Sequence, residues 1–143
     1  MSVLLNVHAT LISFQGKGIL LTGESGSGKS DLALRLIMEQ SAKLVADDRV
    51  ILEKHNDKLI GYAPLNLANK LEVRGLGIVE FKAKKKEQIS LCVNLCKNRA
   101  DVERLPQPDF IDFLGISVAK IELYPFDCST IYKIILKTCG KIC

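Results

Sequence analysis

The sequence predicts an α/β fold in which a phosphate-binding loop joins a strand to a helix within a mixed, strand-rich sheet. The run GILLTGESGSGKSDLALRLI places eight small or polar residues between an apolar strand and apolar residues at helical spacing. Most of the remaining chain alternates short apolar runs with turn residues, as strands do. With 143 residues, 48% of them hydrophobic and 25% charged, the chain suits a single domain, 1–143.

The central loop fits the spacing G-x-x-x-x-G-K-[ST] without a gap. Its residues are Gly23, Glu24, Ser25, Gly26, Ser27, Gly28, Lys29 and Ser30. The glycines let the backbone curl until its N–H groups point at one anion, and the following helix adds the positive end of its dipole. Lys29 would bind the β- and γ-phosphates and Ser30 would bind Mg²⁺. A glycine-rich turn that binds nothing has no need for Lys-Ser at this spacing, so the loop predicts nucleotide binding.

The segments that flank the loop are expected to be strands and one helix. VLLNVHATLISFQGKGILLT predicts two or three short strands, broken at His8 and at QGKG. In the helix after the loop, Leu32, Leu36 and either Ala33 or Ile37 would form the buried face. KLIGYAP, ISLCVNL and VAKIELYPF predict further strands. DCSTIYKIILKTC predicts a closing helix capped by Asp127 or Ser129.

Two acidic segments are candidates for chemistry. In AKLVADDRVILE, Asp47 and Asp48 separate two strands, and carboxylates at a strand end beside a phosphate loop can reach a metal or accept a proton. Without the loop, a solvated turn would be the better interpretation. In LEVRGLGIVEF, Glu72 and Arg74 alternate with apolar residues before two glycines, which indicates a bend. This stretch is equally compatible with a surface ion pair and with a site for metal and phosphate.

Composition excludes several classes of partner. The net charge is +4, and its most local source, KAKKKE, is interpreted as a solvated loop, with binding of a phosphate-rich or acidic partner as the alternative. No aromatic residue interleaves with these lysines and the chain has no tryptophan, so we expect no nucleic-acid binding. The apolar runs have the length of strands and no export signal is seen, so we expect no membrane span and a cytoplasmic location.

The five cysteines are expected to be reduced and mostly packed. Cys92 and Cys96 lie four residues apart in a strand-like run, which separates them by roughly 13 Å, too far for a disulfide. The cysteines also lack the C-x-x-C pairs of zinc sites, so no metal ligation by cysteine is predicted.

Four segments together resemble a known family. NVHAT, GESGSGKS, LVADDRV and LEVRGLGIV occur in the order found in bacterial HPr kinase/phosphorylase, and the chain resembles the catalytic domain of that family in a short form without the N-terminal domain. The resemblance implies a P-loop kinase domain of the HPr kinase/PEP carboxykinase-like class. It also implies ATP- and Mg²⁺-dependent phosphorylation of a serine in HPr, a phosphocarrier of the sugar phosphotransferase system. Many members also remove this phosphate with inorganic phosphate as acceptor.

The resemblance also implies roles for individual residues. Lys29 would bind the transferring phosphate, and Ser30 and Glu72 would hold Mg²⁺. Either Asp47 or Asp48 would be the base that accepts the serine proton. The remaining two active-site residues of the family match His8 and Arg104. Judged without the family, a lone histidine between strands is more often a packed residue than a catalytic one.

The second half of the chain departs from the longer members. LYPFDCS replaces the RPGRN-like segment that the family associates with phosphorolysis, and Asp127 would repel a phosphate there, so we expect weak or absent phosphorylase activity. The C-terminal helices that longer members use for HPr docking and hexamer contacts are expected to be reduced or absent. The resemblance implies a homo-oligomer, with a hexamer as the form known in the family. Two alternatives remain: a nucleotide-sensing module that binds ATP and a partner without transfer, and a small-molecule kinase.

Overall fold

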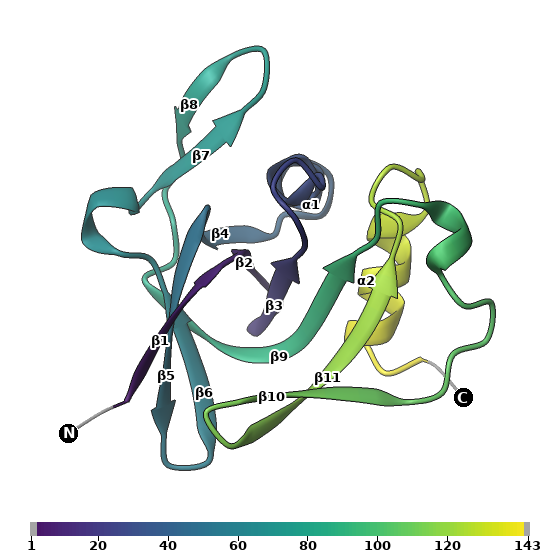
Figure 1. Ribbon diagram of the computed structural model, residues 1–143. Coiled ribbons are helices and arrows are strands. Elements are labelled where there is room, and N and C mark those ends of the chain that lie inside the picture. Colours follow the sequence, from purple (N-terminus) through teal and green to yellow (C-terminus); the bar gives the residue numbers. More distant parts are fainter. Residues whose placement is uncertain (1–2, 142–143) are drawn as a thin grey trace.

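The computed structural model describes residues 3–141, in which a strongly curved sheet packs against two helices (Figure 1). The strands are β1 (Leu4–His8), β2 (Thr10–Phe14), β3 (Lys17–Thr22), β4 (Lys43–Ala46), β5 (Arg49–His55), β6 (Lys58–Tyr62), β7 (Lys70–Val73), β8 (Gly77–Glu80), β9 (Lys86–Leu95), β10 (Asp109–Phe113) and β11 (Ile116–Leu123). The helices are α1 (Lys29–Gln40) and α2 (Thr130–Thr138), and the short 3₁₀ helices are η1 (Leu65–Leu67) and η2 (Arg99–Asp101).

Strand β9 links the two halves of the sheet. The order is β1-β5-β6-β9-β3-β2-β4, and β11 also pairs with β9 while β10 lies beyond it. Near its start β9 is antiparallel to β6, and farther along it is parallel to both β3 and β11. The carboxyl ends of β3, β9 and β11 therefore lie at one edge of the sheet, the edge from which α1 begins (Figure 1). Ligands of α/β sheets bind at such an edge.

Apolar residues are buried on both faces of the sheet. One cluster joins the sheet to α1 and α2 and includes Leu21, Leu32 and Ile131. The other cluster includes Leu11, Leu20 and Leu52, which come from β2, β3 and β5. Successive residues of a strand point to opposite faces, so Leu20 and Leu21 belong to different clusters. Burial on both faces explains why β2 and β3 contain consecutive apolar residues, Leu11-Ile12 and Ile19-Leu20-Leu21.

Most of the expected elements are confirmed. The first three strands break at His8 and at the QGKG turn, and α1 buries Leu32, Leu36 and, of the two alternatives, Ala33. Of the two predicted cap residues, Ser129 lies at the N-cap position of the closing helix α2, but its side chain makes no capping hydrogen bond. The strand that precedes α2 ends at Leu123, before the aromatic residues that were assigned to it.

Other parts of the chain add to the predicted picture or correct it. The bend expected in LEVRGLGIVEF is the turn of a two-stranded hairpin, β7–β8, which stands apart from the main sheet beside α1 (Figure 1). DFIDF forms β10, which was not predicted. The expectation that most cysteines are packed is wrong for the described residues, because Cys92 and Cys96 are buried whereas Cys128 and Cys139 are exposed. Cys143 lies outside the described residues.

No helix within residues 3–141 is long and apolar enough to cross a membrane.

Candidate functional site

The loop between β3 and α1 wraps around the ammonium group of Lys29. Lys29 Nζ donates hydrogen bonds to the carbonyl oxygens of Gly23 and Glu24, at 2.9 Å each. Gly28 has a φ of +96° at the start of α1, a conformation that L residues rarely adopt. A side chain at Gly23 would place its Cβ 2.6 Å from the hydroxyl oxygen of Ser27. Glycine is therefore required at both positions for this tight turn.

The charge of Lys29 is held in a buried position. Only 6% of the residue is exposed. Burial lowers the pKa of Lys29 below its ordinary value, and the negative charges of Asp47 and Asp48 partly counteract this shift. Because a buried ammonium is poorly solvated, an incoming anion would stabilise its charged form. The loop is thus electrostatically prepared for phosphate.

Asp47 is the centre of the hydrogen-bond network beside the loop. Its Oδ1 atom accepts hydrogen bonds from the hydroxyls of Thr10, at 2.8 Å, and Ser30, at 2.9 Å. Its Oδ2 atom accepts one from the backbone N–H of Glu72, at 3.2 Å. The residue is 6% exposed. Asp47 therefore connects the phosphate loop to β2 and to the β7–β8 hairpin.

Asp48 lies in a different environment, at the surface. Its Oδ1 atom is 3.4 Å from Nε2 of His8, and its side chain is 65% exposed against 37% for His8. Asp48 also has a φ of +68°, in the left-handed region that aspartate tolerates better than most residues. The two neighbouring carboxylates thus have separate partners: Asp47 contacts the loop, and Asp48 contacts His8.

Strand pairing brings His8 close to Asp47 and Asp48, because the break between β1 and β2 lies opposite the break between β4 and β5. His8 pairs with Arg49 at the end of the β1–β5 ladder, and Leu11 pairs with Ala46 in the β2–β4 ladder. The break after His8 therefore lies opposite the Asp47–Asp48 break, and the N–H of Ala9 bonds to the carbonyl of Asp48, at 3.3 Å. Thr10 was not among the predicted site residues, although it lies in the NVHAT segment that carries the resemblance.

The predicted metal ligands lie around Asp47. The hydroxyl of Ser30 bonds to Asp47, whereas Glu72 does so through its backbone, and its exposed carboxylate makes no hydrogen bond or ion pair with the described residues. Between residues 3 and 141 no group of three or more His, Cys, Asp or Glu side chains is arranged to hold a metal. Mg²⁺ commonly binds through one or two protein oxygens together with substrate phosphates, so these hard oxygen donors fit Mg²⁺.

On the opposite side of the loop, the segment 124–128 carries the predicted Asp127. Its carboxylate accepts hydrogen bonds from Nε and Nη2 of Arg99, at 3.0 Å and 2.5 Å. The pair lowers the pKa of Asp127, chiefly through these hydrogen bonds. The prediction that Asp127 acts as an uncompensated negative charge is therefore wrong, because Arg99 neutralises it. Arg99 was not foreseen from the sequence.

Arg104 is not brought into contact with this network. It follows η2, is exposed, and makes no hydrogen bond or ion pair with other residues that the structure describes. Its guanidinium is available to a ligand or a partner, but its predicted catalytic role is not supported by a contact to Lys29, Ser30 or Asp47.

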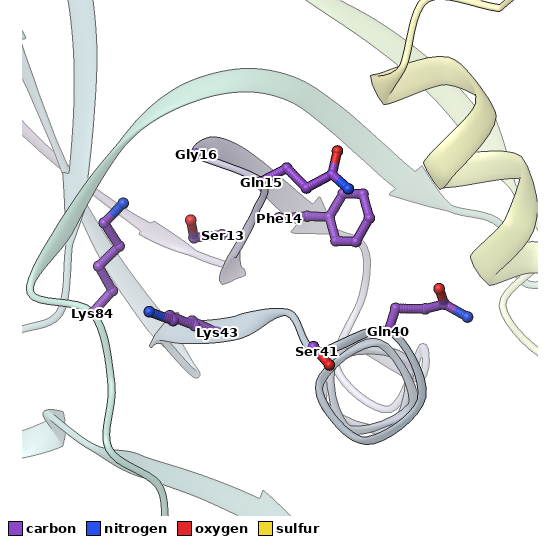
Figure 2. A pocket seen from close by; sticks show the side chains of 8 residues that line it. All are labelled: Ser13, Phe14, Gln15, Gly16, Gln40, Ser41, Lys43 and Lys84. Carbon is purple, nitrogen blue, oxygen red and sulfur yellow. The ribbon is translucent and has the colours of Figure 1, made fainter.

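A separate hollow of about 380 Å³ lies at the other end of α1. Most of its lining residues have polar or charged side chains, although Phe14 and Gly16 also line it, and Figure 2 shows Lys43 and Lys84 on one side with Gln40 on the other. Lys84 is paired with the buried Glu87, at 2.6 Å. Because it adjoins the C-terminal end of α1 and the loop adjoins the N-terminal end, this hollow is not part of the phosphate-loop site.

These features define an α/β domain with a mixed, strand-rich sheet and a P-loop kinase fold. The sequence matches the family described as HPr Serine kinase C-terminal domain over residues 1–138, and the chain belongs to this family. The prediction of the family and that of the fold class are both confirmed.

Individual relatives agree with this assignment. HPr kinase/phosphorylase of Bordetella avium is 41% identical over 128 residues, which cover 82% of this chain and 41% of the relative. HPr kinase/phosphorylase of Caldicellulosiruptor bescii is 40% identical over 122 residues, which cover 78% of this chain and 39% of the relative. The chain thus spans about two fifths of the length of these relatives. The solved structure of the Hpr(Ser) kinase/phosphatase from Coxiella burnetii has 25% identity and a TM-score of 0.83, covering 96% of this chain and 97% of that one.

Proposed function

We propose that this chain is a catalytic domain that phosphorylates a serine of HPr or a related phosphocarrier, with ATP and Mg²⁺. The observation that carries the proposal is the junction at Asp47, whose carboxylate bonds to Ser30 of the phosphate loop next to the buried Lys29. Family membership supports the same chemistry. Phosphoryl transfer depends mainly on positioning and charge stabilisation, and these residues supply both.

Different residues bind the phosphates and accept the proton during transfer. The N–H groups of the loop and the ammonium of Lys29 bind the β- and γ-phosphates. Asp47 accepts the proton of the carrier serine as the serine oxygen bonds to the γ-phosphorus and the bond from that phosphorus to the bridging oxygen breaks, releasing ADP. We assign the base to Asp47 because its hydrogen bond to Ser30 keeps its carboxylate beside the phosphate loop.

The remaining predicted residues have supporting roles. When bound, Mg²⁺ would neutralise charge on the β- and γ-phosphates, and Ser30 and Glu72 would be its protein ligands. The pair of His8 and Asp48 lies at the exposed border of the site, where it can orient the acceptor segment of the carrier. Arg104 is exposed, has no partner among the described residues and is available to the carrier.

The forward reaction is proposed to dominate. Phosphorolysis requires an inorganic phosphate to be held against a phosphoserine, which needs an additional cation. Arg99 is already engaged by Asp127, which belongs to the segment that replaces RPGRN. We further propose that residues 1–143 act as one domain, in the cytoplasm and as a homo-oligomer, without a nucleic-acid partner.

The test uses γ-labelled ATP, Mg²⁺ and each phosphocarrier encoded by the same genome. Label should appear on a carrier serine with the wild-type protein and should be absent with Lys29→Ala. If the protein binds ATP and no carrier is labelled, it is a nucleotide-sensing module. Label on a small molecule instead of a carrier would make it a small-molecule kinase.

A further inference from the structure

The parallel strands place two further loops beside the phosphate loop. Neither of these two loops takes part in the proposed forward transfer. The strands β3, β9 and β11 end at the same edge of the sheet, as Figure 1 shows by the common direction of their arrows. Asp47 reaches the phosphate loop from β4, on the side of β2. The segment after β9 and the segment 124–128 after β11 flank the loop from the opposite side. A nucleotide has a second part, its nucleoside, that must be accommodated outside the phosphate-transfer site.

Phe126 presents an exposed aromatic ring directly at the phosphate loop. A Cβ atom built on Gly28 would lie 3.0 Å from both Cε1 and Cζ of Phe126. The residue is nevertheless 57% exposed. Phenylalanine has no polar group that benefits from water, so exposure of this ring contributes nothing to folding. One part of the ring contacts the loop, and the rest remains accessible to a ligand.

The segment that carries Phe126 is fixed from both sides. Nη1 of Arg35 in α1 donates to the carbonyl of Asp127, at 3.4 Å, and Nη2 donates to the carbonyl of Pro125. The ring of Tyr124 packs edge-to-face against Phe126, with centroids 5.7 Å apart. Arg99 contacts the carboxylate of Asp127 and the face of Tyr124, 5.0 Å from the ring centroid. An aromatic surface held in this way loses little conformational entropy when a flat ligand stacks on it.

We propose that Phe126 is the stacking platform for the base of the nucleotide whose phosphates are bound by the loop of residues 23–30. This proposal rests on the proposed function, because it requires that a nucleotide is bound there. Stacking on an aromatic ring is favourable for every nucleobase, since each has a π face. Phe126 therefore contributes affinity for nucleotides over inorganic polyphosphates, and it does not select adenine over guanine.

The test compares binding of Mg·ATP with binding of Mg·tripolyphosphate, which has the phosphates without the base. Phe126→Leu keeps an apolar side chain against Gly28 but removes the π face. It should weaken ATP binding by roughly tenfold and leave tripolyphosphate binding unchanged. The matched control, Phe110→Leu, changes another exposed phenylalanine, on β10, and should alter neither affinity.

A second variant gives a direct optical readout. The chain has no tryptophan, so Phe126→Trp would carry the only one. Its fluorescence should respond to Mg·ATP and to Mg·GTP by stacking, and not to Mg·tripolyphosphate. ATP affinity should be retained in this variant, because tryptophan preserves the aromatic surface.

The outcomes separate the platform from the proposed function. If the wild type binds tripolyphosphate and ATP equally well, or if Phe126→Leu binds ATP like the wild type, the platform is refuted and the phosphate site stands. Equal losses for both ligands in Phe126→Leu would also refute it, because the ring would then only shape the loop. If ATP affinity is unchanged and only transfer to the carrier falls, Phe126 is a contact for the protein partner. A wild type that binds neither ligand refutes the proposed function and the platform together.

Discussion

Replacing Asp47 by asparagine should remove phosphoryl transfer at a moderate cost in stability. The asparagine side chain would have nearly the same shape, but only one of its two terminal atoms could accept hydrogen bonds. In the wild type Oδ1 accepts from the hydroxyls of Thr10 and Ser30, and Oδ2 accepts from the N–H of Glu72. The hydroxyls can rotate whereas the N–H cannot, so we expect the amide oxygen to face Glu72 and the amide nitrogen to face the hydroxyls.

The magnitude follows from these contacts. The substitution converts charge-assisted hydrogen bonds to neutral ones and forces the two hydroxyls to act as acceptors, which should lower the free energy of unfolding by about 1.5–3 kcal/mol. For a chain of 143 residues this corresponds to a melting temperature lower by roughly 5–10 °C. Loss of a general base should lower the rate of transfer by about 10²–10⁴-fold. Binding of ATP should be largely retained, because the base acts on the acceptor.

The assay measures transfer from γ-labelled ATP to the carrier at a temperature where both proteins are folded, alongside thermal unfolding. Thr10→Val is the matched control, since it removes one hydrogen bond to Asp47 and leaves the carboxylate charged. It should lower stability by about 1 kcal/mol and retain most of the transfer rate. Asp48→Asn is the competing variant and should cost less transfer than Asp47→Asn. A larger loss in Asp48→Asn would assign the base to Asp48, and wild-type transfer in Asp47→Asn would refute the reasoning.

Three further predictions concern charges. Lys29→Ala should weaken binding of Mg·ATP at least tenfold, measured by calorimetry, whereas Lys97→Ala, at the rim of the loop, should not; equal affinities would contradict the phosphate-loop assignment. Burial alone would raise the pKa of Glu87, but hydrogen bonds, above all from Lys84, lower it below its ordinary value of 4.5. The ionised Glu87 carboxylate therefore stabilises the fold at pH values above 4.5, and this stabilisation is lost as the pH falls through the lower pKa of the folded state. The difference in melting temperature between the wild type and Glu87→Gln should be largest at neutral pH and should shrink under acidic conditions. A difference that does not change with pH would refute this prediction. Asp127→Asn should release the arginine that it binds and raise the ratio of pyrophosphate release to forward transfer by about tenfold, and an unchanged ratio would show that this arginine does not limit the reverse reaction.

Local sequence signals predicted the phosphate loop and its helix. The loop from Gly23 to Ser30 depends on spacing within a few residues, and the structure has the expected strand, turn and helix around it. Asp47 and Asp48 were found for the same reason, since two carboxylates at a strand end stand out in an apolar run. Their different environments were not predictable, because the partners that distinguish them, Thr10 and His8, lie on strands that pair only in the folded chain.

The segment 124–128 shows how a missing long-range partner changes an electrostatic argument. In the sequence alone, Asp127 looks like a single negative charge in the segment that replaces the basic RPGRN-like motif. In the structure, the bidentate contact with Arg99 joins two residues that are 28 positions apart, and the pair has no net charge. The case for weak phosphorolysis therefore depends on an occupied arginine and not on repulsion by a carboxylate. Before this arginine could bind an inorganic phosphate, it would have to give up its bidentate contact with Asp127. Under the proposed function, the direction of the reaction would therefore depend on competition between Asp127 and the phosphate for the same guanidinium.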